Sequence, residues 1–383
     1  MRISDVQHQT RAHRILQRAL HADRVPHAYI FHGPPGIGRE MLAVRFARVL
    51  LCQAPAPADD LDIGSDLNFS ATDACGRCES CQLVHADTHP DLHRIYRNLA
   101  AYHPDPAVRA RKALNLAVDV IRHFLIEKTG SKPLLGRAKV FLIREAELLT
   151  NAAQNALLKT LEEPPPQTFI LLLVTALDRL LPTTQSRSQP VPFAPLPAEF
   201  VAQQLRAQRP DLPPAAERFL ANFCNGQLGT ALEQADDRVF DVKQACAGRL
   251  ARLDPHGVSD LARQFHEDAK ALAQKYRRRE PDASETVAMR TALQTLLAVH
   301  ATFYRDVLHA NVGREDHLIN EDQTDIIQSL ARKIDAGDAV LALNELATAE
   351  SRLQRNANVT LTVETLFGRL GRLAAMAPIS RHG

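Results

Sequence analysis

The chain has 383 residues, of which 45% are hydrophobic and 23% charged, and its formal net charge is +2. This length predicts two or three domains, and the composition is that of a soluble globular protein. A dedicated, stand-alone nucleic-acid binder would usually be more basic, so the near-neutral charge argues against that class. The longest apolar stretch, Phe169 to Ala176, is too short to span a bilayer, and the first residues lack the apolar core of a signal peptide. We therefore expect a cytoplasmic protein with no membrane contact.

The first half of the chain alternates short apolar runs with helical patterns, which is typical of a parallel α/β domain over residues 1–195. The runs are so apolar that we expect strands covered on both faces. The predicted strands are Ala28 to His32, Lys139 to Ile143 and Phe169 to Val174, and the predicted helices include Met41 to Leu51 and Asn151 to Leu161.

Strand patterns nearly vanish after a proline-rich stretch that contains Pro190, Pro192, Pro195 and Pro197. We interpret this stretch as a linker. Residues 196–240 are predicted to form a small helical domain, and residues 241–376 a larger all-helical domain, because their apolar residues recur at helical spacing.

A glycine-rich segment, GPPGIGRE from Gly33 to Glu40, lies between a predicted strand and a predicted helix. That context is required of a phosphate-binding loop of the form G-x-x-x-x-G-K-[ST], whose backbone N–H groups wrap phosphate at the start of a helix. Arg39 stands where a lysine would reach the terminal phosphates, and Glu40 stands where a Ser or Thr hydroxyl would bind magnesium. The sequence therefore predicts a degenerate phosphate loop.

The second apolar strand, VFLI, is followed by Arg144 and Glu145. A working site of this class carries an Asp here to hold magnesium, and a cation at that position opposes metal binding. We infer a loss of catalysis. Because Glu40 and Arg144 carry opposite charges at the two positions that would ligate magnesium, we also predict an ion pair between them, the alternative being two unrelated solvated charges.

Three cysteines have C-x-x-C-x-x-C spacing, at Cys75, Cys78 and Cys81, and Cys52 lies upstream. Four thiolates suit a closed tetrahedral zinc site with a structural role, although iron–sulfur clusters also use cysteine ligands. His85 and His89 are alternative ligands. Cys224 and Cys246 are isolated and are expected to be small buried side chains.

The segment KVFLIREAELLTNAAQNALLKTLEEPP, from Lys139 to Pro165, resembles the core segment of bacterial clamp-loader subunits of the AAA+ class. His27 to Phe31, Leu180 to Ser188 and Asn225 to Leu232 are similar to the same family, so recognisable motifs cover residues 27 to about 232. Within the family, the delta-prime subunits of DNA polymerase III, which are described as not hydrolysing ATP, match best. Gly229 stands where active relatives carry a sensor arginine.

The resemblance implies an AAA+ P-loop α/β domain with a zinc module, a helical lid and a helical collar that joins a five-membered ring. It implies the gamma/tau and delta subunits, the sliding clamp and primer-template DNA as partners, within a DNA-directed DNA polymerase holoenzyme. It also implies structural zinc at Cys52, Cys75, Cys78 and Cys81, although the gap between Cys52 and Cys75 is longer than expected for the family.

Arg187 lies in a segment, Ser186-Arg187-Ser188, where the family has Ser-Arg-Cys. The resemblance implies that this arginine projects onto ATP bound by a neighbouring subunit; the alternative is a surface arginine in a polar turn. The degenerate nucleotide site comprises Gly33, Gly36, Gly38, Arg39, Glu40, Arg144, Glu145 and Gly229. The favoured function is thus a non-catalytic clamp-loader subunit, and the alternatives are a catalytic gamma/tau-like ATPase subunit and an independent zinc-containing DNA-binding protein.

Overall fold

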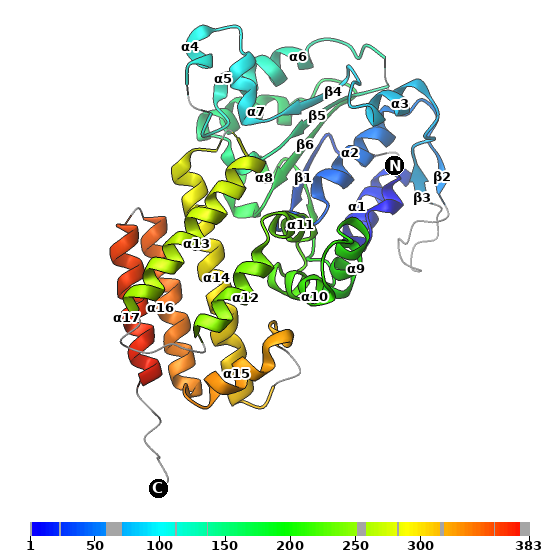
Figure 1. The fold of residues 1–383 in the computed structure, drawn as a ribbon. Helices are drawn as coiled ribbons and strands as arrows, with labels where there is room; N and C mark the ends of the chain where they lie inside the picture. Colours follow the sequence, from blue (N-terminus) through cyan, green and yellow to red (C-terminus); the bar gives the residue numbers. More distant parts are fainter. Residues whose placement is uncertain are drawn as a thin grey trace. The chain divides into compact units, whose positions relative to one another are not determined.

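The computed structural model describes residues 2–22, 24–58, 71–111, 113–135, 137–250, 258–281, 283–314, 318–355 and 357–375. It divides into two compact units, Met1–Pro197 and Ala198–Gly383, which are described separately here (Figure 1). The division into three domains at residues 195 and 240 remains a prediction; residue 240 lies in the first turn of a helix, α12 (Val239–Leu250).

The first unit is built on one parallel sheet with the strand order β4-β5-β6-β1-β7. Its strands are β1 (Ala28–His32), β4 (Leu92–Ile95), β5 (Lys139–Ile143), β6 (Thr168–Val174) and β7 (Gln189–Pro192). Two short strands, β2 (Ala56–Ala58) and β3 (Ala71–Asp73), form a separate antiparallel pair. Its helices are α1 (Thr10–His21), α2 (Arg39–Leu51), α3 (Glu79–His85), α4 (Pro106–Arg109), α5 (Val118–Ile121), α6 (Glu127–Thr129), α7 (Asn151–Glu162) and α8 (Pro182–Gln185).

Both faces of this sheet are buried, as the continuous apolar runs predicted. On one face Ile30 and Phe141 join a core with α5 and α7, which contribute residues such as Leu157. On the other face Tyr29 packs edge-on against Phe46 of α2. Helix α7 starts where the Thr150 hydroxyl accepts a hydrogen bond from the backbone N–H of Ala153.

The interpretation of Pro190 and Pro192 as part of a linker was wrong. Both lie in β7, which pairs in parallel with β1 at the edge of the sheet. An edge strand tolerates proline because one side of its backbone needs no partner. The sequence also gave no indication of β4, whose residues are mostly half-buried and include the polar His93 and Arg94.

The second unit is all-helical in its described residues. Its helices are α9 (Ala198–Gln208), α10 (Pro214–Phe223), α11 (Leu228–Asp236), α12, α13 (Val258–Arg279), α14 (Glu285–Asn311), α15 (Thr324–Ala331), α16 (Ala336–Gln354) and α17 (Val359–Ala375). Helices α12 to α17 share a core in which Phe265 contacts Phe367 edge-on, and Phe303 is fully buried. The predicted fold class, a P-loop-type α/β domain followed by helical regions, is confirmed.

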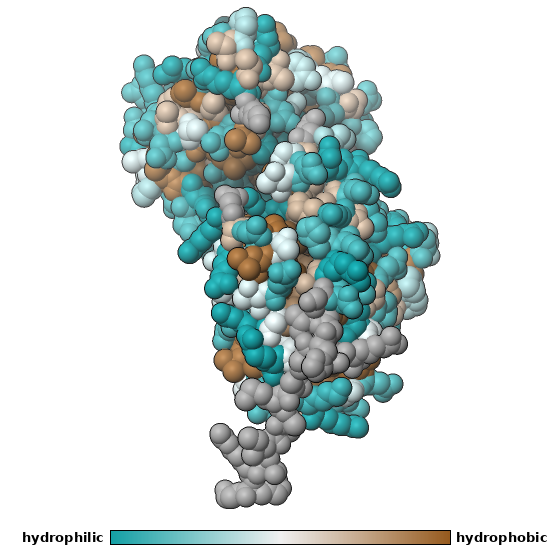
Figure 2. All heavy atoms as spheres, turned by 60° about the vertical axis from the view of Figure 1, so that its left-hand side comes forward, coloured by the Kyte–Doolittle hydropathy of each residue, from teal (hydrophilic) through white to brown (hydrophobic). Residues whose placement is uncertain are grey.

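Figure 2 shows a face on which hydrophilic side chains predominate and hydrophobic ones form small separate groups. Among the described residues, no helix combines the length and the apolar character needed to cross a membrane.

Gly33 follows β1 and has a backbone conformation that other residues rarely adopt, with φ of 149°. A Cβ atom at this position would lie 2.6 Å from the backbone oxygen of Phe193, whereas Cβ atoms in proteins essentially never approach another heavy atom within 3.0 Å. We therefore expect Gly33→Ala to lower the free energy of unfolding by about 2 kcal/mol or more, measured by urea denaturation. Gly130→Ala is the matched control, since its Cβ would make only an ordinary 3.8 Å contact; an equal loss in both variants would contradict the steric argument.

Candidate functional site

The phosphate-loop frame predicted from the sequence is present between β1 and α2. Gly36 and Gly38 both have positive φ, of 70° and 95°, and Gly38 is the residue that precedes the first turn of α2. Backbone N–H groups at a helix start are the groups that bind phosphate in loops of this kind. The side chains that follow the glycines therefore decide what the loop can do.

The carboxylate of Glu40 is engaged by two arginines. Its Oε2 atom accepts hydrogen bonds from Arg144, at 3.0 Å from Nε and 2.9 Å from Nη2. Its Oε1 atom accepts from Nη1 of Arg94 at 3.1 Å. The predicted Glu40–Arg144 ion pair is thus confirmed, and Arg94 of β4, which also binds Asp87, is a partner that sequence reasoning missed.

These charges remain partly solvated. The side chains of Glu40, Arg94 and Arg144 are 36%, 23% and 44% exposed. At this exposure each pair contributes at most about 1 kcal/mol to stability, not the roughly 3–5 kcal/mol at stake when a buried pair is broken. The carboxylate of Glu40 is therefore already paired with two arginines of the same chain.

Arg39, at the position where a phosphate loop usually has lysine, is held by a backbone group of its own chain. Its guanidinium donates a hydrogen bond to the backbone oxygen of Val174, the last residue of β6. Burial lowers the pKa of Arg39, while Glu147 and Glu40 act in the opposite direction. This hydrogen bond uses one N–H donor of the guanidinium, so Arg39 has one donor fewer available for a bound phosphate group.

A cavity of about 500 Å³ lies beside the loop. Three arginines and three glutamates line it, so its charges balance: Arg39, Arg97, Arg144, Glu40, Glu145 and Glu147. Glu145 follows β5 with a φ of 51°, and its Oε2 lies 3.5 Å from Nε of Arg97. An anionic phosphate chain finds no surplus of positive charge among these side chains. Gly229, the other predicted member, is the second residue of α11 in the second unit.

Arg187 lies in the turn between α8 and β7, with its side chain 35% exposed. Its Nη1 donates to the backbone oxygen of Thr183 at 3.0 Å and to the Ser186 hydroxyl at 3.3 Å. Its Nη2 lies 2.6 Å from Oε1 of Glu162, at the last residue of α7. Ser188, which replaces the family's cysteine, is buried and donates to the backbone oxygen of Thr184 at 3.0 Å. Its burial fixes the turn and leaves the arginine at the surface.

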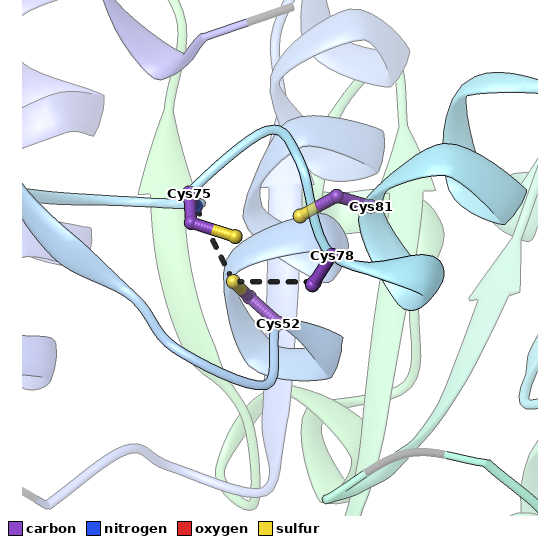
Figure 3. A group of neighbouring side chains, drawn as sticks. All are labelled: Cys52, Cys75, Cys78 and Cys81. Carbon is purple, nitrogen blue, oxygen red and sulfur yellow. Dashed lines mark hydrogen bonds between the residues drawn. The ribbon is translucent and has the colours of Figure 1, made fainter.

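The four cysteines of the predicted metal site converge from three elements (Figure 3). Cys52 follows α2, Cys75 lies in the loop after β3, Cys78 precedes α3 and Cys81 lies in its first turn. Their Sγ atoms all lie within 4.8 Å of one another, and those of Cys52 and Cys78 are 3.9 Å apart. Zn–S bonds of about 2.3 Å at tetrahedral angles place sulfurs about 3.8 Å apart, so the thiols fit a tetrahedral metal ion.

The environment of the thiols differs within the cluster. Hydrogen bonds from the backbone N–H groups of Arg77 and Cys78 lower the pKa of Cys75 to about 6. Burial raises the pKa of Cys81 to about 12 and also raises that of Cys52. The backbone N–H of Cys75 donates to Sγ of Cys52 at 3.3 Å, which favours a thiolate there.

Neither histidine alternative belongs to the cluster. His85 lies at the exposed end of α3, and His89 is buried with its Nδ1 accepting from the backbone N–H of Asp91. The pairing of β2 with β3 brings the chain back beside Cys52 despite the long gap before Cys75. Part of that gap, residues 59–70, lies outside the described residues.

Comparison with known proteins decides the family. The family described as "DNA polymerase III, delta subunit" matches residues 8–197, and that described as "DNA polymerase III, delta subunit, C terminal" matches residues 264–370. The DNA polymerase III subunit delta' of Escherichia coli (strain K12) is 34% identical over 67% of this chain and 69% of its own length. The chain belongs to the delta' family of DNA polymerase III subunits. The delta' subunit of Bacillus subtilis (strain 168) is similar over 94% of each chain, at 28% identity.

The catalytic alternative has weaker support. A DNA polymerase III gamma/tau subunit of Mycobacterium tuberculosis is 34% identical, but over only 48% of this chain and 27% of its own length. The delta' family thus accounts for a larger part of the chain than the gamma/tau subunits do. At the two positions discussed above, the chain has a carboxylate paired with two arginines and an arginine cation.

Proposed function

We propose that this delta' subunit acts in a clamp loader without hydrolysing ATP itself, and that it supplies Arg187 to ATP bound by a neighbouring subunit. The observation that carries the proposal is the engagement of Glu40 by Arg144 and Arg94. In an active site of this class the two positions held by Glu40 and Arg144 bind magnesium, which neutralises the charge that develops on the transferred phosphate. Here they bind each other.

The proposed role of Arg187 is supported by its chemistry and place. A guanidinium contributed from outside an active site stabilises the charge of the transition state. Such a residue must reach another chain, and the Arg187 side chain is partly exposed on a turn fixed by Ser188. Gamma/tau-type subunits, to which part of this chain is similar, are the proposed owners of that ATP. A delta subunit, the sliding clamp and primer-template DNA complete the proposed assembly.

The proposed cofactor is one structural zinc ion held by Cys52, Cys75, Cys78 and Cys81. All four tetrahedral positions are filled by thiolates, so the ion would supply stability and no chemistry of its own. It would tie the end of α2 to the start of α3 next to the sheet. Cytoplasmic location, proposed for this subunit, favours thiolate–metal bonds over disulfides.

The isolated chain is expected to show no magnesium-dependent ATP hydrolysis above a blank, because the magnesium ligands are absent. The measurement is phosphate release by the purified chain, with a gamma/tau-type subunit as the positive control. Glu145→Gln guards against a contaminating enzyme. Activity in the wild-type chain that this substitution abolished would overturn the proposal and support the catalytic alternative; activity that persisted in the variant would identify a contaminant.

A further inference from the structure

Arg187, the residue proposed to reach ATP on a neighbouring subunit, forms an ion pair with Glu162, a carboxylate of its own chain. The 2.6 Å contact uses Nη2 of Arg187, while Nη1 is engaged by Thr183 and Ser186. Both terminal nitrogens are thus occupied. These are the nitrogens with which an arginine binds phosphate in a two-pronged manner.

The carboxylate comes from a well-fixed element. Glu162 is the last residue of α7, whose Leu157 and Leu161 are buried in the core below the sheet. Its side chain is 49% exposed. A negative charge at a helix C-terminus is unfavourable, because the last carbonyl groups already carry partial negative charge. Arg187 relieves this repulsion, so the pair is favoured while no other anion is present.

We propose that Glu162 is a positioning residue that holds Arg187 in a resting position and competes with the neighbour's phosphate for it. This inference rests on the trans-acting role of Arg187 proposed above. When ATP binds next door, its terminal phosphate offers the guanidinium more than one negative charge and two-pronged hydrogen bonding. Arg187 then leaves Glu162 and binds the nucleotide. We call the Arg187–Glu162 ion pair, which breaks when nucleotide is bound, the latch.

The exposure of the pair sets the size of the effect. Ion pairs between side chains that are one-third to one-half exposed change an equilibrium by a factor of up to about five. The latch is therefore weak enough to yield to a phosphate. It is strong enough to lower the fraction of Arg187 side chains that are free of Glu162 when the neighbouring site is only partly occupied by nucleotide.

The experiment compares Glu162→Gln with Glu163→Gln in the complex reconstituted from this subunit and its partners. Glu163 is the next residue and is exposed, with no ion pair recorded among the described residues. In Glu162→Gln we expect the KM for ATP to fall by about two- to fivefold, with kcat nearly unchanged, because only the resting state loses a contact. Glu163→Gln should match the wild type.

The variant Glu162→Gln/Arg187→Ala separates the latch from a simple structural role. If Glu162 acts through Arg187, the double variant should have the ATPase parameters of Arg187→Ala alone. An unchanged or raised KM in Glu162→Gln, or an equal fall in Glu163→Gln, would overturn the latch. If Arg187→Ala itself left hydrolysis unchanged, the proposed function would fail and the latch with it. If Arg187→Ala lowered hydrolysis as expected but Glu162→Gln left the KM for ATP unchanged, only the latch would be overturned and the proposed function would stand.

Discussion

Arg187→Ala is expected to lower ATP hydrolysis at the neighbouring subunit's site by about 10³-fold or more in a reconstituted clamp loader. The guanidinium would stabilise charge that develops in the transition state, so its loss should reduce the rate of the chemical step. The measurement is a pre-steady-state time course of phosphate release, in which hydrolysis from one site should disappear. Clamp loading onto primed DNA should fall in parallel.

Two further variants define what the arginine does. Arg187→Lys keeps the positive charge but loses the planar fork, so it should recover only part of the rate. Arg179→Ala removes another exposed arginine from the same unit, in a 3₁₀ turn at Leu177–Arg179, and should leave the rate unchanged. Full activity in Arg187→Ala, with the subunit present in the complex, would refute the trans-acting role. Equal losses in Arg179→Ala and Arg187→Ala would point to general surface charge instead.

The elements that could be predicted from the sequence are those whose burial is complete. The bounds of β1 and β5 match the predicted strands, because a strand covered on both faces is an uninterrupted apolar run. The edge strand β7 was missed because it contains two prolines, and a proline-rich stretch is typical of a linker. Strand β4 was missed because its two central residues, His93 and Arg94, are polar, and the partner of Arg94, Glu40, lies 54 residues away. Edge strands depend on tertiary pairing that no local pattern reports.

The same distinction applies to the candidate sites. Charge complementarity at two positions of known chemistry was enough to predict the Glu40–Arg144 pair. The engagement of Arg187 by Glu162 could not be predicted, since the two residues lie in different motifs and only the fold brings α7 beside the turn after α8. The cysteine spacing predicted three ligands directly. The fourth, Cys52, was expected from the family resemblance; the pairing of β2 with β3, which has no strong sequence pattern, brings Cys75 back beside it.

Cys81→Ser is expected to abolish metal binding by the four-cysteine site and to destabilise the first unit by at least about 3 kcal/mol. Structural zinc contributes roughly 10–16 kcal/mol of binding free energy in small zinc peptides. Only part of that is at stake here, because α2 and α3 already hold two of the thiols near their positions. The measurements are metal content by mass spectrometry of the native chain and urea denaturation. Zinc should fall from about one ion per chain to none.

The control for this variant is Cys224→Ala, which removes a buried thiol of the second unit and should leave the metal content unchanged. A chain that carried iron and absorbed visible light would contradict zinc and favour the cluster alternative. No metal in the wild-type chain after purification with zinc would contradict a metal site altogether.

The pH dependence of metal affinity provides an independent test of the same site. In the metal-free chain the pKa of Cys81 is raised to about 12 and that of Cys52 is also raised, both by burial, so these thiols keep their protons at neutral pH. The pKa of Cys75 is lowered to about 6, so above that pH its thiolate is already formed. Metal binding near pH 7 must therefore displace at least two protons, and affinity should rise about 100-fold per pH unit. A flat dependence between pH 7.5 and pH 8.5 would show that the thiols are not the ligands, because histidine or carboxylate ligands have already lost most of their protons in this range.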